Sequence, residues 1–272
     1  MHLYRGYGLT IRSALAIPGA IPIAPPGAID IDIRFGAAAP GPVSRRWGPY
    51  EIGPAGFVFA QPGVARYFCP DARTMLIERD GAAADADVAA MLVATAMPAL
   101  LWSRGEIVLH AAAAILPGSS RAVAVLGPSG SGKSTLLAGL LARGAHALAD
   151  DSVCLRITDG IVTASGLPGG WHAPLTPHAP IRPFHPVPID RQLAECPLGA
   201  MLFLGDPAGR PRALTGAAAL TALLANRHRD RIARLSGREA AFLAGLAAIT
   251  KAVAMYEIPA HATPHLAPNG FP

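Results

Sequence analysis

Cysteine, aromatic side chains and dense runs of positive charge are all scarce in this chain of 272 residues. The three cysteines, Cys69, Cys154 and Cys196, lie far apart and are odd in number, which excludes a disulfide framework and the usual spacing of a zinc site. Widely spaced free thiols are typical of a reducing compartment, so we expect a cytoplasmic protein.

The charge balance is only mildly positive, with 23 Lys and Arg against 18 Asp and Glu and a formal net charge of +5. No Lys/Arg run is dense enough to predict nucleic-acid binding. Long apolar runs are also missing: the longest, residues 88–103, contains Pro98 and is shorter than the roughly 20 residues that span a bilayer. Because Met1 to Arg5 lead into an alternating pattern, no signal peptide is indicated. We therefore expect neither a nucleic-acid nor a membrane partner.

What the chain does contain is 51% hydrophobic residues, together with 29 Gly and 27 Pro, enough for a core connected by many loops. Residues 1–82 are β-rich. Ile29–Phe35 alternates strictly between apolar and charged residues, and Phe57–Phe59, Val64–Phe68 and Thr74–Glu78 are further short strands separated by Gly and Pro. These residues predict a small β-rich N-terminal domain without a constellation that carries chemistry.

Residues 83–272 predict a second, α/β domain, which a connecting helix over 83–104 joins to the first. That helix, patterned from Asp85 to Trp102, is expected to be kinked or divided at Pro98. A long loop is predicted from Gly166 to Pro197 because this stretch is rich in Gly and Pro. The remaining predicted elements are strands over Glu106–Ile115, Ala122–Leu126, Ala145–Ala149, Leu198–Leu204 and Ala252–Ile258, a hairpin over Val153–Thr163, and helices over Leu214–Ala225 and Gly237–Ile249.

The segment Gly127–Ser134 fits the pattern G-x-x-x-x-G-K-[ST] at every fixed position, between an apolar strand and a helical pattern. Glycines allow the backbone N–H groups to approach phosphate oxygens, and the start of the following helix favours an anion. We expect Lys133 to reach the β- and γ-phosphates of a nucleotide and the Ser134 hydroxyl to ligate Mg²⁺. The predicted nucleotide-binding residues are Gly127, Ser129, Gly130, Ser131, Gly132, Lys133, Ser134 and Thr135.

Asp150 and Asp151 follow the next apolar strand and are adjacent. If the first ends the strand and the second begins the turn, their side chains diverge, and one can face a metal ion while the other faces an acceptor hydroxyl. Two close carboxylates would also raise the pKa of one of them, which suits a general base. The alternative is an exposed turn without a function. His110, on the strand before the loop strand, would by itself more often be a hydrogen-bonded core histidine.

Three stretches together resemble the HPr kinase/phosphorylase superfamily: Leu109–Ala114 with its histidine, the glycine-rich loop Gly127–Thr135, and Arg143–Asp151. The similarity extends to the shorter HPr-kinase-like serine kinases, including those found with lasso-peptide biosynthesis genes, because Leu101–Gly105 precedes the histidine as an L-x-x-R-G segment. The resemblance covers residues 100 to 155.

This resemblance implies a phosphoenolpyruvate-carboxykinase-like P-loop fold and ATP-dependent phosphorylation of a serine on a peptide or protein, such as a lasso precursor peptide. By position it implies that Asp150 is the base, that Asp151 and Ser134 lie near Mg²⁺, and that His110 supports the acceptor or the carboxylates. Lys133 completes the predicted catalytic set, and a homo-oligomer is expected to be possible. The glycine-rich segment Gly166–Trp171 lacks the glutamate of the bifunctional enzymes, so phosphorolysis and HPr itself as substrate are not implied.

Other readings remain open. A small-molecule kinase would use the same loop and base, and the long segment from Gly166 to Pro197 could serve as its lid. An ABC-type ATPase is disfavoured because Leu235–Glu239 matches the required signature only superficially and no strand ending in Asp-Glu follows. A nucleotide-binding regulator without transfer is a third possibility. Arg182, Arg191, Arg227, Arg229 and Arg231 are candidates for contacts with phosphate or an acidic peptide.

Overall fold

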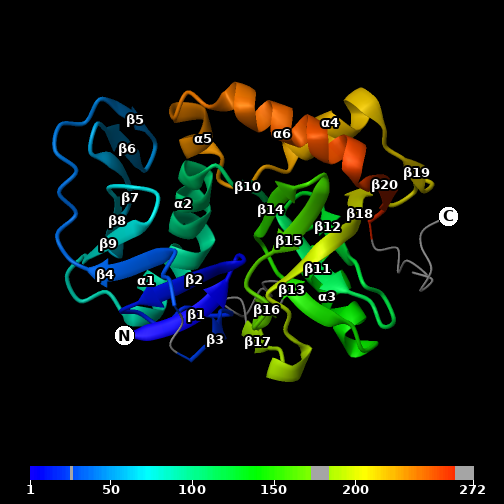
Figure 1. Cartoon of the computed structure of the whole chain (residues 1–272), viewed down its shortest axis with the longest axis horizontal. Coiled ribbons are helices and arrows are strands. Elements are labelled where there is room, and N and C mark those ends of the chain that lie inside the picture. The colour runs from blue at the N-terminus through cyan, green and yellow to red at the C-terminus, as the bar shows by residue number, and fades with distance from the viewer. Residues whose placement is uncertain (25–26, 173–183, 261–272) are drawn as a thin grey trace.

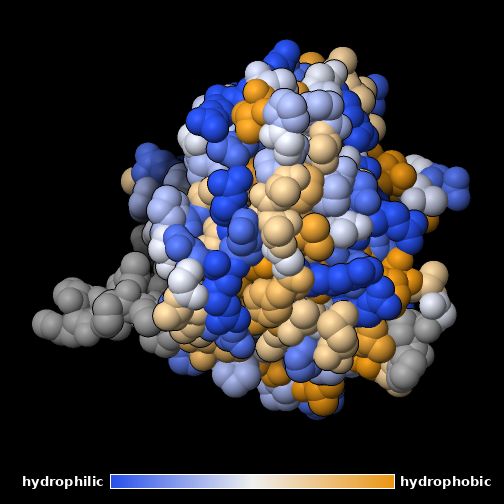
Figure 2. All heavy atoms as spheres, turned by 90° about the vertical axis from the view of Figure 1, so that its left-hand side faces the viewer, coloured by the Kyte–Doolittle hydropathy of each residue, from blue (hydrophilic) through white to orange (hydrophobic). Residues whose placement is uncertain are grey.

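The structure is a computed structural model that describes residues 1–24, 27–172 and 184–260. Two large sheets dominate its mixed α/β architecture, with one long helical segment between them and further helices on the second sheet (Figure 1). The face seen from the left of Figure 1 mixes hydrophilic and hydrophobic residues, with a pale orange band between blue regions (Figure 2).

The first sheet is built entirely from residues 2–79, in the order β3-β1-β2-β4-β9-β8-β7-β6-β5. Most neighbours are antiparallel hairpin partners, but β4 pairs in parallel with both β2 and β9. The strands predicted over residues 29–35, 57–59, 64–68 and 74–78 are all present. The strands are β1 (His2–Gly6), β2 (Leu9–Ser13), β3 (Ile21–Pro22), β4 (Ile31–Phe35), β5 (Arg45–Trp47), β6 (Tyr50–Gly53), β7 (Gly56–Gln61), β8 (Ala65–Cys69) and β9 (Thr74–Arg79).

The second sheet has the order β10-β14-β15-β18-β12-β11-β13, and β20 pairs with β18 and β19. Its long strand β18 pairs antiparallel with β15 through its first residues and parallel with β12 and β20 through its later ones. A separate hairpin joins β16 to β17. The strands are β10 (Ile107–Leu109), β11 (Ala111–Ile115), β12 (Ala122–Leu126), β13 (His146–Ala149), β14 (Val153–Thr158), β15 (Ile161–Ser165), β16 (Gly170–His172), β17 (Phe184–Pro186), β18 (Glu195–Gly205), β19 (Arg212–Ala213) and β20 (Ala254–Pro259).

Two predictions about this region need correction. The single strand expected over 106–115 is broken at His110, because β10 pairs with β14 while β11 pairs with β12 and β13. The expected loop over 166–197 contains β16, β17 and a short 3-10 helix, η2 (Ile189–Arg191), and Arg182 lies outside the described residues. In both cases the hydrogen-bonding partners are distant in sequence, so a local pattern does not reveal them.

The helical segment between the sheets comprises α1 (Asp85–Met91), a π-helical turn η1 (Leu92–Ala96) and α2 (Met97–Arg104). The π-helical turn η1 ends two residues before Pro98, which lies in the first turn of α2, where its missing backbone N–H costs no hydrogen bond. The predicted division of the helix is therefore present. By length and composition the stretch from Asp85 to Arg104 could cross a membrane, yet most of it is buried inside the fold, as expected for a core helix.

Helices α3 (Lys133–Ala142), α4 (Gly216–Ala225) and α6 (Glu239–Ala252) flank the second sheet, whereas the short α5 (Arg231–Leu235) packs against α2 and α6. Strand β11 shows how the layers are ordered. Ala112 and Ala114 pack with Leu137 and Leu140 of α3, whereas the alternate residues of the strand join the main core on the other face. Helices α4 and α6 contribute to that core, so the sheet is covered on both faces.

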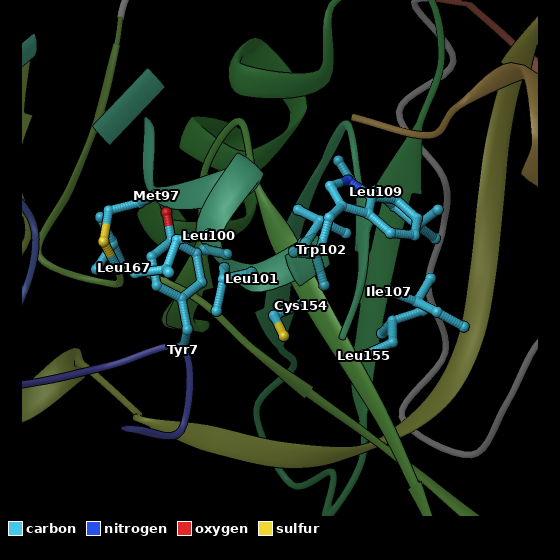
Figure 3. Close-up of a cluster of buried hydrophobic side chains, with 14 of the residues drawn as sticks. Tyr7, Met97, Leu100, Leu101, Trp102, Ile107, Leu109, Cys154, Leu155 and Leu167 are labelled. Carbon is cyan, nitrogen blue, oxygen red and sulfur yellow. The ribbon is translucent and has the colours of Figure 1, made fainter. Parts of the chain in front are cut away.

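One continuous core joins the two sheets. Figure 3 shows Tyr7, from the turn after β1, beside residues of α2 and, further along the cluster, Cys154 and Leu155 of β14. The Tyr7 amide also donates to the Gly166 carbonyl at 2.9 Å. The predicted boundary after residue 82 falls between β9 and α1 and stays a prediction, because the hydrophobic contacts run across it.

Candidate functional site

The glycine-rich loop connects β12 to α3, and three of its glycines, Gly127, Gly130 and Gly132, occupy backbone conformations that other residues rarely adopt. Gly127 has φ +154°, and Gly132, at the start of α3, has φ +100°. A Cβ on Gly127 would lie 2.7 Å from the Ser131 Oγ, so only glycine fits beneath that hydroxyl. The Ser131 Oγ is buried and has no hydrogen-bond partner among the described residues, as expected for a group that binds a ligand.

Lys133 is buried at the first position of α3, with 7% of its surface exposed. Its Nζ donates to the carbonyl oxygens of Gly127 at 2.8 Å and Pro128 at 3.0 Å. The ammonium group therefore crosses the loop and holds its two ends together. The lysine also lies where the loop would surround an anion.

Asp150 directly follows β13 and contacts α3. Its Oδ1 accepts from the Ser134 hydroxyl at 2.9 Å, and its Oδ2 accepts from the His172 amide at 3.0 Å. Burial raises the pKa of this carboxyl group above its usual range, while the two hydrogen bonds oppose that shift. Both carboxylate oxygens are therefore engaged on the side of the glycine-rich loop.

Asp151 lies on the other side because its backbone has a left-handed conformation, with φ +72°. Its Oδ1 is 3.3 Å from the His110 Nδ1 and its Oδ2 is 3.8 Å from the His228 Nε2. The carboxylate remains 40% exposed. The two aspartates thus diverge, but Asp150, and not the expected Asp151, is the neighbour of Ser134, since the turn rotates the second side chain toward the histidines.

Two backbone hydrogen bonds position the histidines. The His110 amide donates to the Asn226 carbonyl at 2.7 Å, and the His228 amide donates to the Val108 carbonyl at 2.9 Å, so the segment after α4 pairs with the end of β10. The imidazole rings stack with centroids 5.1 Å apart. His228 was not among the predicted site residues: it lies within a short polar segment whose pairing with β10 no sequence pattern reveals.

The His110 ring donates to Asp151, whereas the His228 Nε2 faces the Ala94 carbonyl oxygen at 3.4 Å and lies beyond hydrogen-bond distance of the Asp151 carboxylate. The His110 Nδ1 faces the backbone oxygen of Asp151 at 3.2 Å as well as its carboxylate, and both are acceptors, so this nitrogen carries the proton. Burial lowers the pKa of His110, and it lowers the pKa of His228 to about 4. At neutral pH both rings are therefore uncharged, and His110 orients the carboxylate without neutralising it.

The ligand atoms of His110, Asp151 and His228 all lie within 4.8 Å of one another, a spacing that a metal ion could bridge. The ring orientation argues against a shared ion, because an imidazole binds a metal in the plane of its ring and these two planes are stacked at 14°. The arrangement fits a hydrogen-bonded Asp–His pair better than a metal centre.

A cavity of about 810 Å³ lies between the glycine-rich loop and this cluster. Gly127, Pro128 and Ser129 form one side, and Asp151 faces it from another. Its remaining lining residues are Ala94, His110, Phe203, Leu204, Gly205, Ala222, Ala225, Asn226, Arg227, His228, Arg229 and Glu257. The cavity therefore brings together the loop, an available carboxylate and two guanidinium groups.

The other predicted residues are placed less centrally. Gly130 is an exposed loop residue with φ +83°, and Thr135 is exposed on the first turn of α3. Arg191 donates to the Leu141 carbonyl at the far end of α3 and is not among the residues that line the cavity. Arg227 and Arg229 do line it. The roles assigned to all these residues stay predictions.

Comparison with known proteins adds little. No protein-family model matches the chain, and no curated protein matches it. Among solved structures, the chain is similar to the Hpr(Ser) kinase/phosphatase from Coxiella burnetii at 16% identity and a TM-score of 0.35, over 57% of this chain and 86% of that one. A similarity this loose carries no argument, so the functional conclusion rests on the site itself.

Proposed function

We propose that this protein is an ATP-dependent kinase that phosphorylates a serine hydroxyl of a peptide or protein. One observation carries the proposal: Gly127–Ser129, the start of the nucleotide-binding pattern, and Asp151 line the same cavity, while a second aspartate is bound to Ser134. A nucleotide-binding regulator needs the loop alone. Phosphoryl transfer to an alcohol also needs a nearby group that accepts a proton.

Mg²⁺ fits the pair formed by Ser134 and Asp150. A hydroxyl and a carboxylate are hard oxygen ligands of the type that Mg²⁺ prefers, and they already lie 2.9 Å apart. Burial raises the pKa of Asp150, and a bound cation would favour its ionised form. When bound, the ion would neutralise charge on the nucleotide phosphates.

Asp151 is the proton acceptor in this proposal, in place of the Asp150 implied by the family resemblance. Its carboxylate is exposed to the cavity and oriented by the His110 N–H, whereas both oxygens of Asp150 are already engaged. The serine oxygen forms a bond to the γ-phosphorus while the bond from that phosphorus to the β–γ bridging oxygen breaks. ADP leaves with the electron pair, and the proton of serine passes to Asp151.

The positive groups stabilise the charge that moves during transfer. In this proposal Lys133 and the loop amides bind phosphate oxygens, which Arg227 and Arg229, in the wall of the cavity beside Gly127–Ser129, help to neutralise. As acceptor we propose a peptide or protein with an accessible serine, for which a lasso precursor peptide is one candidate. A cytoplasmic location and a homo-oligomer also belong to the proposal, the first because three free thiols suit a reducing compartment.

The test separates the roles of the two aspartates. Purified protein is incubated with ATP, Mg²⁺ and a degenerate serine-centred peptide library, and phosphopeptides are measured by mass spectrometry. We expect Asp151→Asn to lower transfer by about 10²- to 10⁴-fold with nucleotide binding retained, because only the proton acceptor is lost. Asp150→Asn should weaken Mg²⁺-dependent binding of a fluorescent ATP analogue.

The matched control is Asp159→Asn, which removes one carboxylate from the exposed turn between β14 and β15. It should leave both transfer and nucleotide binding unchanged. Transfer at the normal rate in Asp151→Asn would overturn the base assignment. ATP binding without transfer to any peptide, or to a panel of small alcohols, would instead leave a nucleotide-binding regulator.

A further inference from the structure

We propose that a second cavity, between the first sheet and the start of α5, binds a carboxylate group of the acceptor peptide. This inference rests on the proposed function, since it names the chemistry of the acceptor. The cavity has a volume of about 380 Å³, enough for one or two side chains. Its walls are Pro49, Tyr50, Phe59, Gln61, Met91, Thr95, Arg229, Asp230 and Arg231.

One residue in the wall of this cavity has a buried hydroxyl group without a hydrogen-bond partner in the described part of the chain. Tyr50, the first residue of β6, is only 2% exposed, and its hydroxyl has no hydrogen-bond partner among the described residues. A buried hydroxyl without a partner costs on the order of a full hydrogen bond, and a ligand atom that accepts from it would remove that cost. Because a phenol donates readily to an anion, its position in the cavity wall points to an acceptor atom.

The wall of this cavity carries more positive than negative charge. The carboxylate of Asp230 is already bound by Arg227 at 3.2 Å and by Arg234 at 2.9 Å. Within the described parts of the chain, no carboxylate forms an ion pair with Arg229 or Arg231. The cavity wall therefore carries two guanidinium groups that its own aspartate does not neutralise, and a carboxylate suits them by bidentate pairing.

The guanidinium of Arg231 is held in place by aromatic rings. It lies 6.0 Å from the ring centre of Tyr50 and 5.7 Å from that of Trp47. A Cβ on Gly48, in the turn between β5 and β6, would lie 2.7 Å from its Nη1, so the turn packs closely against it. The cation is thus positioned over the ring of Tyr50 before any ligand arrives, which lowers the entropic cost of binding.

The second cavity adjoins the first, where we propose that phosphoryl transfer takes place. Arg229 lines both cavities, and the adjacent residues Ala94 and Thr95 line the first and the second respectively. The loop residues Gly127–Ser129 line only the first cavity, so the nucleotide phosphates belong there. An acceptor with its serine near Asp151 can therefore place a neighbouring acidic residue against Tyr50 and Arg231.

The experiment compares acidic with neutral peptides. A serine-centred library is scanned one position at a time with Asp or Glu against Asn or Gln, and the ratio of the two phosphorylation rates is measured. We expect the unsubstituted protein to prefer the acidic residue at one position. Arg231→Gln and Tyr50→Phe should each lower that ratio by about tenfold, the effect of losing one hydrogen bond to a charged group.

A second readout does not depend on transfer. Binding of the peptide acetyl-Glu-Glu-Glu-amide is measured by calorimetry, with inorganic phosphate as the competing free anion. We expect Arg231→Gln to weaken binding of the peptide, while Arg121→Gln, which removes an exposed arginine outside the cavity, leaves it unchanged. The Tm of Tyr50→Phe should stay equal or rise, because the change removes an unpaired buried hydroxyl and not a contact of the fold.

The outcomes separate the two proposals. If no peptide is phosphorylated but acidic peptide binding depends on Arg231 and Tyr50, the kinase proposal fails and the carboxylate site stands. If peptides are phosphorylated without an acidic preference, or with one that survives both substitutions, the carboxylate site is wrong. Binding of inorganic phosphate alone would also overturn it.

Discussion

The backbone conformation of Asp151 sets the direction of its carboxylate group in this site. With φ +72°, the residue turns its carboxylate from the glycine-rich loop toward His110 and His228. An aspartate tolerates this conformation better than most residues do. A single turn residue therefore separates a carboxylate that is bound to Ser134 from one that faces the cavity.

His228 predicts a loss of stability in acid. Burial lowers its pKa in the folded protein to about 4, against about 6.5 in an unfolded chain. Between these values the unfolded chain binds more protons than the folded protein, so the free energy of unfolding falls as the pH decreases. The lowered pKa of His110 acts in the same direction, and the raised pKa of Asp150 acts in the opposite one.

The measurement is urea unfolding between pH 4 and 8 for the unsubstituted protein and for His228→Asn. The free energy of unfolding should fall less steeply toward acid in the variant, because the titrating ring is gone. An unchanged slope would show that His228 is not the group that binds protons on unfolding.

At the scale of elements, the end of β15 approaches the end of β13 so closely that only glycine fits between them. A Cβ on Gly166 would lie 2.3 Å from the Cβ of Ala149 and 3.0 Å from the Ser152 carbonyl oxygen. These neighbours flank the two aspartates. Gly166, at the start of the glycine-rich segment Gly166–Trp171, thus packs against the backbone that carries both aspartates.

Gly166→Ala should destabilise the protein by about 1–3 kcal/mol, because the added methyl group must push two backbone segments apart. It should also lower the proposed phosphoryl transfer, since Ala149 directly precedes Asp150. The matched control is Gly139→Ala on the exposed side of α3, where a Cβ meets nothing within 4 Å. That change should raise stability by up to about 1 kcal/mol. Thermal unfolding of both variants checks the contrast, and equal effects would contradict it.

At the scale of the whole molecule, the two sheets are joined by polar contacts as well as by the shared core. The Arg156 side chain on β14 pairs with Glu106 at 2.9 Å and donates to the Tyr7 carbonyl at 2.8 Å. Both charged side chains are largely buried, at 27% and 15% exposure. This arginine therefore ties the first hairpin to the second sheet.

Arg156→Met should lower the free energy of unfolding by about 2 kcal/mol, because it leaves the partly buried Glu106 without its cation. Arg212→Met, which removes an exposed partner of Glu257, should cost less than about 1 kcal/mol. Hydrogen exchange should increase in β2 and β14 together in the first variant. Faster exchange confined to one sheet would show that the sheets open independently.

The glycine-rich loop between strand and helix and the adjacent aspartates could be predicted from the sequence, because the residues that define them are contiguous in the chain. Four of the nine strands of the first sheet could also be predicted, since short apolar and alternating runs between Gly and Pro are a local signal. The break at His110 could not, because it depends on which distant strands supply hydrogen bonds.

Only the tertiary structure decided which aspartate faces the cavity, that His228 joins it, and that Tyr50 and Arg231 share a wall. Each of these depends on contacts between segments far apart in the chain. The physical reason is that side-chain direction at the end of a strand is set by one backbone angle and by packing against remote elements. Neither of these leaves a periodic trace in the sequence.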